Sequence, residues 1–132
     1  MIPSVKLNQT TLWIVGGRNK HNDLKSTEFL FLDQPPIRGP DLPFNVSCHC
    51  LVRYDSNSIY LIGGFQNGKR SEQVWIINPL EDFSIREAPS MKAARTLHSC
   101  GKMEINGKVA LIVAGGYNGS SSVWGKNYIF IS

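Results

Sequence analysis

Leu61-Ile62-Gly63-Gly64 is a short apolar run that ends in two glycines, and it has two counterparts in the chain. They are Ile14-Val15-Gly16-Gly17 and Val113-Ala114-Gly115-Gly116. The steps between the pairs are 47 and 52 residues, counted from Gly16 to Gly63 and from Gly63 to Gly115. A pattern that returns roughly every 50 residues is typical of repeat architectures, so each interval is expected to be one structural unit.

The apolar run before each glycine pair predicts a β-strand. These runs (residues 12–15, 59–62 and 109–114) are short and rich in β-branched or aromatic residues. They are apolar at nearly every position, so both faces should be buried between other sheets. The two glycines allow positive φ and a close approach of another backbone.

Each unit repeats further strand-like segments in the same order. A first strand is expected at residues 5–7, 50–54 and 100–105, and a third at 28–32, 73–77 and 127–131. A fourth is expected at 83–86, and more weakly at 37–38. Asn106-Gly107 predicts a tight hairpin turn, and polar loops are expected at residues 18–26, 65–71 and 117–122. Each unit is therefore predicted to be a four-stranded antiparallel meander.

The double glycines, the turn at Asn78-Pro79 and the aromatic residue Phe83 resemble the motif of Kelch-repeat β-propellers. The segments that lead into His49 and His98 fit the same pattern. The resemblance implies an all-β protein of about 2.75 Kelch-type blades, an incomplete propeller that spans residues 1–132. Blade 1 would cover about residues 4–39, blade 2 about 46–88, and blade 3 about 98–132 without its last strand.

Ring closure takes ~4 to 8 blades, so about three would leave two apolar sheet faces in water. The chain is therefore expected to be a fragment of a larger propeller or to self-associate.

Composition excludes little. The net charge is +4 and no dense basic run is present, so nucleic-acid binding is not expected. No apolar run is long enough for a transmembrane helix, and no signal-peptide pattern is present. Together with the odd number of cysteines, this favours a cytoplasmic location. Sequons at Asn8, Asn45 and Asn118 instead favour an extracellular parent protein.

The cysteines allow three interpretations. Cys50 and Cys100 lie at nearly equivalent places in two units, where small buried thiols would pack well, and this is the preferred interpretation. A disulfide is the second. A zinc site from Cys48, His49, Cys50, His98 and Cys100 is the third, but alternate residues of a strand point to opposite faces. No metal or other cofactor is expected.

No motif of a hydrolase, metalloprotease, P-loop protein or dinucleotide-binding enzyme is present, so the chain is not expected to be an enzyme. The resemblance implies a protein–protein interaction scaffold. The alternative is a fragment of a secreted or cell-surface Kelch propeller, either a receptor or a galactose-oxidase-like enzyme. The copper-ligating arrangement of that enzyme is not recognisable among Tyr54, Tyr60, Tyr117 and Tyr128.

In the Kelch family, the loops that follow the double glycine and those that enter each first strand form the ligand-binding face. Arginine and aromatic residues are enriched at binding hot spots. The resemblance therefore implies a face that takes an acidic protein or peptide, with these candidates: Arg18, Lys20, Lys25, Phe65, Lys69, Arg70, Arg95 and Tyr117. His21 and Lys92 lie in the same loops.

Overall fold

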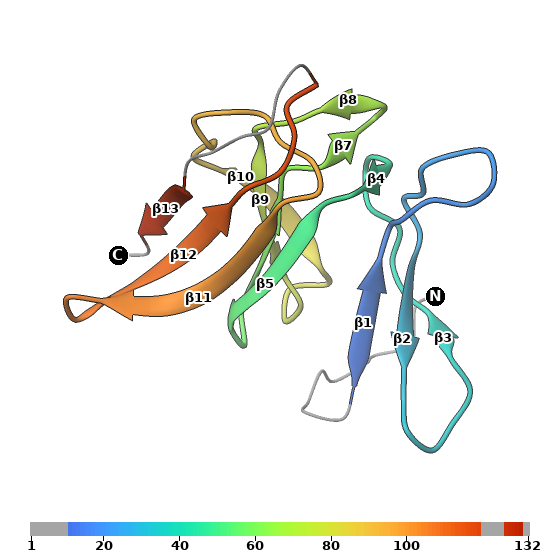
Figure 1. The fold of residues 1–132 in the computed structure, drawn as a ribbon. Coiled ribbons are helices and arrows are strands. Elements are labelled where there is room, and N and C mark those ends of the chain that lie inside the picture. The colour runs from blue at the N-terminus through green and yellow to red at the C-terminus, as the bar shows by residue number, and fades with distance from the viewer. Residues whose placement is uncertain (1–10, 120–125, 131–132) are drawn as a thin grey trace.

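The computed structural model describes residues 11–119 and 126–130, which form antiparallel β-sheets (Figure 1). The first sheet has the order β1 (Leu12–Val15), β2 (Thr27–Leu30), β3 (Ile37–Arg38). The second has the order β10 (Ser84–Ala88), β9 (Val74–Asn78), β6 (Ser58–Ile62), β5 (Cys50–Asp55). The third has the order β11 (Ser99–Ile105), β12 (Lys108–Ala114), β13 (Lys126–Phe130). A small sheet joins β4 (Val46–Ser47), β7 (Phe65–Gln66) and β8 (Lys69–Arg70).

The meander predicted for each unit is complete in the second sheet. Its four strands pair in chain order, with the β7–β8 hairpin inserted between β6 and β9. The Asn106-Gly107 turn joins β11 to β12, with φ of 50° and 77° at its two residues. The first strand predicted at residues 5–7 lies outside the described residues. An all-β architecture is thus confirmed, whereas the blade boundaries and the blade count stay predictions.

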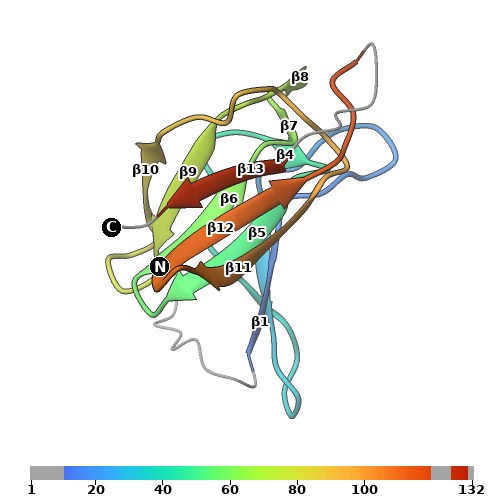
Figure 2. The ribbon, with the colours of Figure 1, turned by 60° about the vertical axis from the view of Figure 1, so that its left-hand side comes forward.

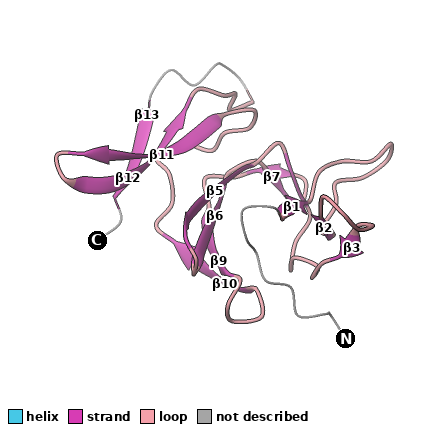
Figure 3. Ribbon diagram, turned by 90° about the horizontal axis from the view of Figure 1, so that it is seen from below, coloured by secondary structure: helices cyan, strands magenta, loops and turns pink. Residues whose placement is uncertain are grey.

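The second sheet is covered on both faces, as the unbroken apolar run in β6 predicts. Alternate side chains of a strand point to opposite faces. Ile59 and Leu61 pack in a core with Val15 of the first sheet. Tyr60 and Ile62 pack in another core, which contains Leu111 and Val113 of the third sheet. Figure 3 shows the three sheets as successive groups of strands, with the second in the middle.

Aromatic rings fill the space between the first two sheets. Phe83, just before β10, lies with its ring centroid 5.0 Å from that of Trp13 and 5.6 Å from that of Phe29. Trp13 and Phe29 are stacked at 6.2 Å. Phe83, the aromatic residue of the predicted motif, therefore joins the second sheet to the first.

The two outer sheets each keep an apolar face that nothing in the described chain covers. Leu12 is 61% exposed and Ile14 is 43% exposed on β1, while Met103 is 45% exposed on β11. Met103, Ile112 and Ala114 line a shallow groove on the third sheet. The described sheets do not close into a ring, and the expected self-association or further blades stay predictions.

The preferred interpretation of the cysteines was wrong. Cys50 on β5 and Cys100 on β11 form a disulfide that joins the second and third sheets, with Cα atoms 6.2 Å apart. β5 and β11 lie beside each other, as Figure 2 also shows. Cys48 is exposed and has a free thiol. The described residues contain no helix long and apolar enough to cross a membrane.

Candidate interaction face

The glycine pairs let two backbones meet at one end of the sheets. Gly63 and Gly64 have φ of 61° and 82°, and the Gly64 amide donates to the Arg95 carbonyl at 2.9 Å. A Cβ on Gly64 would lie 2.6 Å from the Ser47 carbonyl oxygen, so a side chain does not fit. The positive φ and close backbone approach expected of these glycines are confirmed.

The same hydrogen bonds occur one repeat earlier. The Gly17 amide donates to the Val46 carbonyl at 2.8 Å, and the Gly17 carbonyl accepts from the Leu24 amide at 2.9 Å. In the second unit the Gly64 carbonyl accepts from the Ser71 amide, also at 2.9 Å. Each of these two glycine pairs therefore holds both its own loop and the segment that enters the next sheet.

These contacts gather loops from all three units at one end. Val46 of β4 pairs with Leu24 in the first loop and with Gln66 of β7 in the second. In the third unit, Thr96 and Tyr117 exchange backbone hydrogen bonds of 2.9 Å. Figure 1 shows β4, β7 and β8 together at this end. The described parts of the predicted loops (residues 18–26, 65–71 and 117–119), with the segments that enter β5 and β11, thus form one surface, which we call the loop face; residues 120–122 of the third loop lie outside the described residues.

The segment at residues 65–71, expected to be a polar loop, is largely a hairpin. β7 and β8 pair across a turn at Asn67 and Gly68, which have φ of 51° and 78°. The buried Gln66 side chain donates to the Gly63 carbonyl and accepts from Trp75 Nε1, both at 2.9 Å. An asparagine–glycine pair between strands was the signal for this hairpin.

The loop face carries most of the predicted basic side chains in an accessible form. The exposed residues are Arg18, Lys20, His21, Lys25, Lys69, Arg70 and Lys92. Asp23 lies among them. Its Oδ1 is 3.9 Å from Arg18 Nε and accepts a hydrogen bond from the Ser47 hydroxyl at 2.8 Å. The face therefore keeps an excess of positive charge around one partly buried carboxylate.

Arg95 is a correction to the predicted set. Its side chain is only 2% exposed, and its Nη1 donates to the Gly115 carbonyl at 3.1 Å. The guanidinium is therefore bonded to the third glycine pair inside the protein and is not available to a partner at the surface. Charge in a loop suggested exposure, but the loop folds back over the junction between the second and third sheets.

Phe65, Arg70 and Tyr117 come together although Tyr117 belongs to another unit. The Arg70 Cζ lies 4.9 Å from the ring centroid of Phe65 and 5.2 Å from that of Tyr117. Phe65 is half-buried, whereas Tyr117 is 39% exposed. The structure does not bring Arg70 into any ion pair with a described carboxylate.

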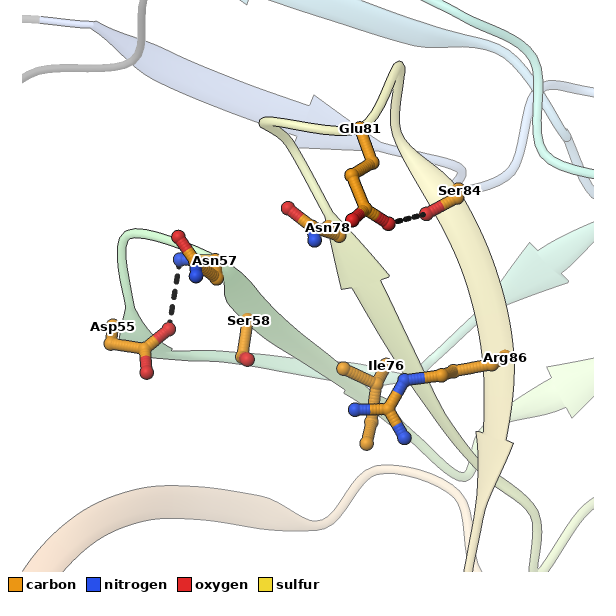
Figure 4. A pocket seen from close by; sticks show the side chains of 8 residues that line it. All are labelled: Asp55, Asn57, Ser58, Ile76, Asn78, Glu81, Ser84 and Arg86. Atoms are coloured by element: carbon orange, nitrogen blue, oxygen red, sulfur yellow. Dashed lines mark hydrogen bonds between the residues drawn. The ribbon is translucent and has the colours of Figure 1, made fainter.

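A second concave site lies at the opposite end of the second sheet (Figure 4). It is a polar cavity of about 270 Å³ lined by Asp55, Asn57, Ser58, Ile76, Asn78, Glu81, Ser84 and Arg86. Asp55 and Asn78 already accept backbone hydrogen bonds within their own turns, from Asn57 and Leu80. These polar groups mainly stabilise the turns between strands, so this cavity is the weaker candidate.

Neither face brings together a metal-binding cluster among the described residues. No group of three or more His, Cys, Asp or Glu side chains is placed to hold a metal ion there. Of the zinc ligands considered, Cys50 and Cys100 are joined to each other, and Cys48 is exposed.

The fold and the loop face define a class: an all-β protein of repeated antiparallel sheets that collects its loops at one end. The chain is similar to Kelch-like protein 40 of Xenopus tropicalis, with 30% identity over 113 residues. The matched region is 82% of this chain and 18% of that relative, so the chain spans about a fifth of its length. No family model matches the chain. The similarity points to the Kelch type of repeat.

Proposed function

We propose that this chain is a non-enzymatic protein-interaction module of the Kelch type, and that it binds a protein partner through the loop face. The observation that carries the proposal is the joining of loops from three units into one surface by backbone pairing at Val46 and Thr96. Similarity to a Kelch-like protein supports the same role. Likeness of fold alone does not establish a function, so the properties of this face must support it as well.

The loop face suits recognition for a physical reason. Binding is weakened when loops must be ordered as the partner arrives. Here the glycine hydrogen bonds and the buried Gln66 side chain order the loops before any partner binds. Less conformational entropy is then lost on association, and several loops contact the partner together.

The charge of the face indicates the partner. Lys20, Lys25, Lys69 and Arg70 are exposed there, and Asp23 is mostly shielded beneath them. Opposite charge on a partner speeds encounter and disfavours basic competitors. The proposed partner is therefore an acidic protein or an acidic segment of one.

A second candidate function is supported by the Cys50–Cys100 disulfide. Disulfides persist in oxidising compartments and are rare in the cytosol. This observation favours a secreted or cell-surface Kelch propeller over a cytoplasmic one, and Asn45 of the sequon on the loop face is exposed. Such a protein would still act by binding, as a receptor module.

Quantitative capture experiments test the proposed face. The bait is the 132-residue chain, compared with a variant carrying Arg18→Glu, Lys69→Glu and Arg70→Glu. Arg53→Glu, Arg86→Glu and Lys108→Glu together, at exposed positions outside the loop face, are the matched control because they reverse the same number of charges. The proposal expects a protein that the wild type and the control capture and the triple variant does not. The same protein, once purified, should bind the three baits in the same pattern. Equal capture by all three baits, or no specific capture, would contradict it.

A further inference from the structure

Arg70 contacts two aromatic rings that come from different units. Phe65 faces it across the β7–β8 hairpin, where the two residues are direct cross-strand partners. Tyr117 approaches from the loop after β12. Both contacts are within the range of about 6 Å at which a guanidinium is attracted to the face of an aromatic ring. We call these three residues the arginine stack.

The backbone around the arginine stack is fixed on both sides. Phe65 pairs with Ser47 of β4, whose side chain is 2% exposed. Tyr117 is anchored by its two backbone hydrogen bonds with the buried Thr96. Its hydroxyl donates to the Gly119 carbonyl at 3.0 Å, which orients the ring. The position of Arg70 is therefore set by two sheets together.

Gly119 also lies close to the arginine. A Cβ built on Gly119 would lie 3.1 Å from Arg70 Nη1 and 3.5 Å from Cζ, so the glycine backbone approaches the guanidinium closely. The φ of Gly119 is 106°, which a side chain would rarely adopt. Residue 119 thus leaves room for the arginine without displacing it.

Aromatic contacts occupy the flat faces of a guanidinium and leave its in-plane N–H donors for hydrogen bonds. Two other arginines have a carboxylate within ion-pair distance: Arg18 with Asp23 and Arg38 with Asp41. Arg70 is exposed and has no carboxylate of the described chain within ion-pair distance. The neighbouring Lys69 is also exposed and adds a second positive charge.

We infer that the arginine stack is an oxyanion-reading site, in which Arg70 binds an Asp or Glu carboxylate, or a phosphoserine, on a protein segment. This inference rests on the proposed function and names the group that the loop face recognises. A planar fork of N–H donors matches both oxygens of such a group at once. Because the rings already hold the fork, little side-chain entropy is lost when the oxyanion binds.

Substitutions separate the contribution of the planar N–H donors of Arg70 from that of its positive charge. Arg70→Lys keeps the positive charge but loses both the fork and much of the ring contact, so peptide affinity should fall roughly 10- to 100-fold. Tyr117→Phe keeps the ring but loses the hydroxyl bond to Gly119 that orients it, so it should weaken binding less than Tyr117→Leu, which removes the ring and should bind several-fold more weakly. Arg86→Lys is the matched control and should change nothing.

The test measures fluorescence anisotropy with three labelled peptides: a glutamate-rich peptide, its phosphoserine counterpart and its glutamine counterpart. The inference expects the glutamate-rich or the phosphoserine peptide to bind and the glutamine peptide not to bind. The affinities of the Arg70 and Tyr117 variants should fall as stated in the preceding paragraph. Preference between the first two identifies the oxyanion. Circular dichroism confirms that each variant is folded.

Three results would overturn the inference, and they differ in what they say of the proposed function. If Arg70→Lys binds as well as the wild type, or if no acidic peptide binds although the triple variant loses its captured partner, the loop face binds proteins in another way. If no acidic peptide binds and capture also fails to depend on the face, both the arginine stack and the proposed function are wrong.

Discussion

His98 donates a hydrogen bond from ring Nε2 to the backbone carbonyl of Ile62, 2.8 Å away on the neighbouring sheet. His49 makes the same kind of contact with the backbone of Val15, one repeat earlier. Ile62 and Val15 each directly precede a glycine pair, and the histidines directly precede β11 and β5. Each histidine therefore ties its sheet to the glycine turn of the sheet before.

The histidine contacts predict that stability falls in mild acid. Burial lowers the pKa of His49 and of His98 below the ordinary value of 6.5, although the backbone hydrogen bonds oppose that shift. The unfolded chain then binds protons more readily than the folded one. The stabilisation is fully present above about pH 6.5 and is lost as the pH falls toward the folded-state pKa values. Urea unfolding at a series of pH values measures this.

His49→Gln combined with His98→Gln should flatten the pH dependence of the free energy of unfolding. His21→Gln is the control, because His21 is an exposed loop residue whose backbone, not its ring, is bonded to Asn19. An unchanged pH profile in the double variant would show that these two rings do not carry the effect.

Gly64→Ala should destabilise the protein far more than Gly68→Ala. The two residues have similar φ, 82° and 78°, so the backbone strain of a side chain, about 1–2 kcal/mol, is common to both. A Cβ on Gly64 would also meet the Ser47 carbonyl at 2.6 Å, whereas nothing lies within 4 Å of one on Gly68. We expect a loss of about 3 kcal/mol or more for Gly64→Ala. Equal losses in denaturant unfolding would contradict the close backbone approach.

The disulfide predicts one reactive thiol in the native protein. Mass spectrometry after alkylation of the unreduced, denatured chain should find a single modified cysteine, Cys48. Cys50→Ser with Cys100→Ser should cost roughly 2–4 kcal/mol of unfolding free energy, because the sequence separation of 50 residues closes a long loop. Cys48→Ser should cost little. Alkylation at all three cysteines without reduction would mean that the disulfide is absent in solution.

The geometry of this disulfide explains why sequence reasoning misjudged it. Cys50 pairs with Ile62 and Ser99 pairs with Ala114, and both partners directly precede a glycine pair. The structural equivalent of Cys50 is therefore Ser99, and Cys100 is one residue further along. A shift of one residue on a strand turns a side chain to the other face. The two cysteines thus face each other across the sheets.

The parts that were predictable depend on local signals. Apolar runs, glycine pairs and the Asn106-Gly107 turn locate strands and turns because their conformations are set by neighbouring residues. The burial of Arg95 was not predictable, because it depends on how a loop packs over a junction between sheets. The meeting of Arg70 and Tyr117 is likewise tertiary, since 47 residues separate them in the sequence.

The exposed apolar faces predict that the purified chain associates with itself. Ile14 on the first sheet and Met103 on the third are 43% and 45% exposed, on faces that no described segment covers. In a purified sample a second copy can cover these faces, and burying apolar area favours association. Size-exclusion chromatography with light scattering should therefore find a species of two copies. Ile14→Glu or Met103→Glu should shift it toward the monomer, because a charge would then be buried in the contact.

Leu80→Glu is the matched control, since Leu80 is 68% exposed but lies in a turn between β9 and β10. It should leave the two-copy species intact. A folded wild-type monomer would show that these faces are stable in water, and that their exposure does not drive self-association. A species that persists in both sheet variants would place the contact elsewhere, and the loop face would then be examined by the same measurement on Arg70→Glu.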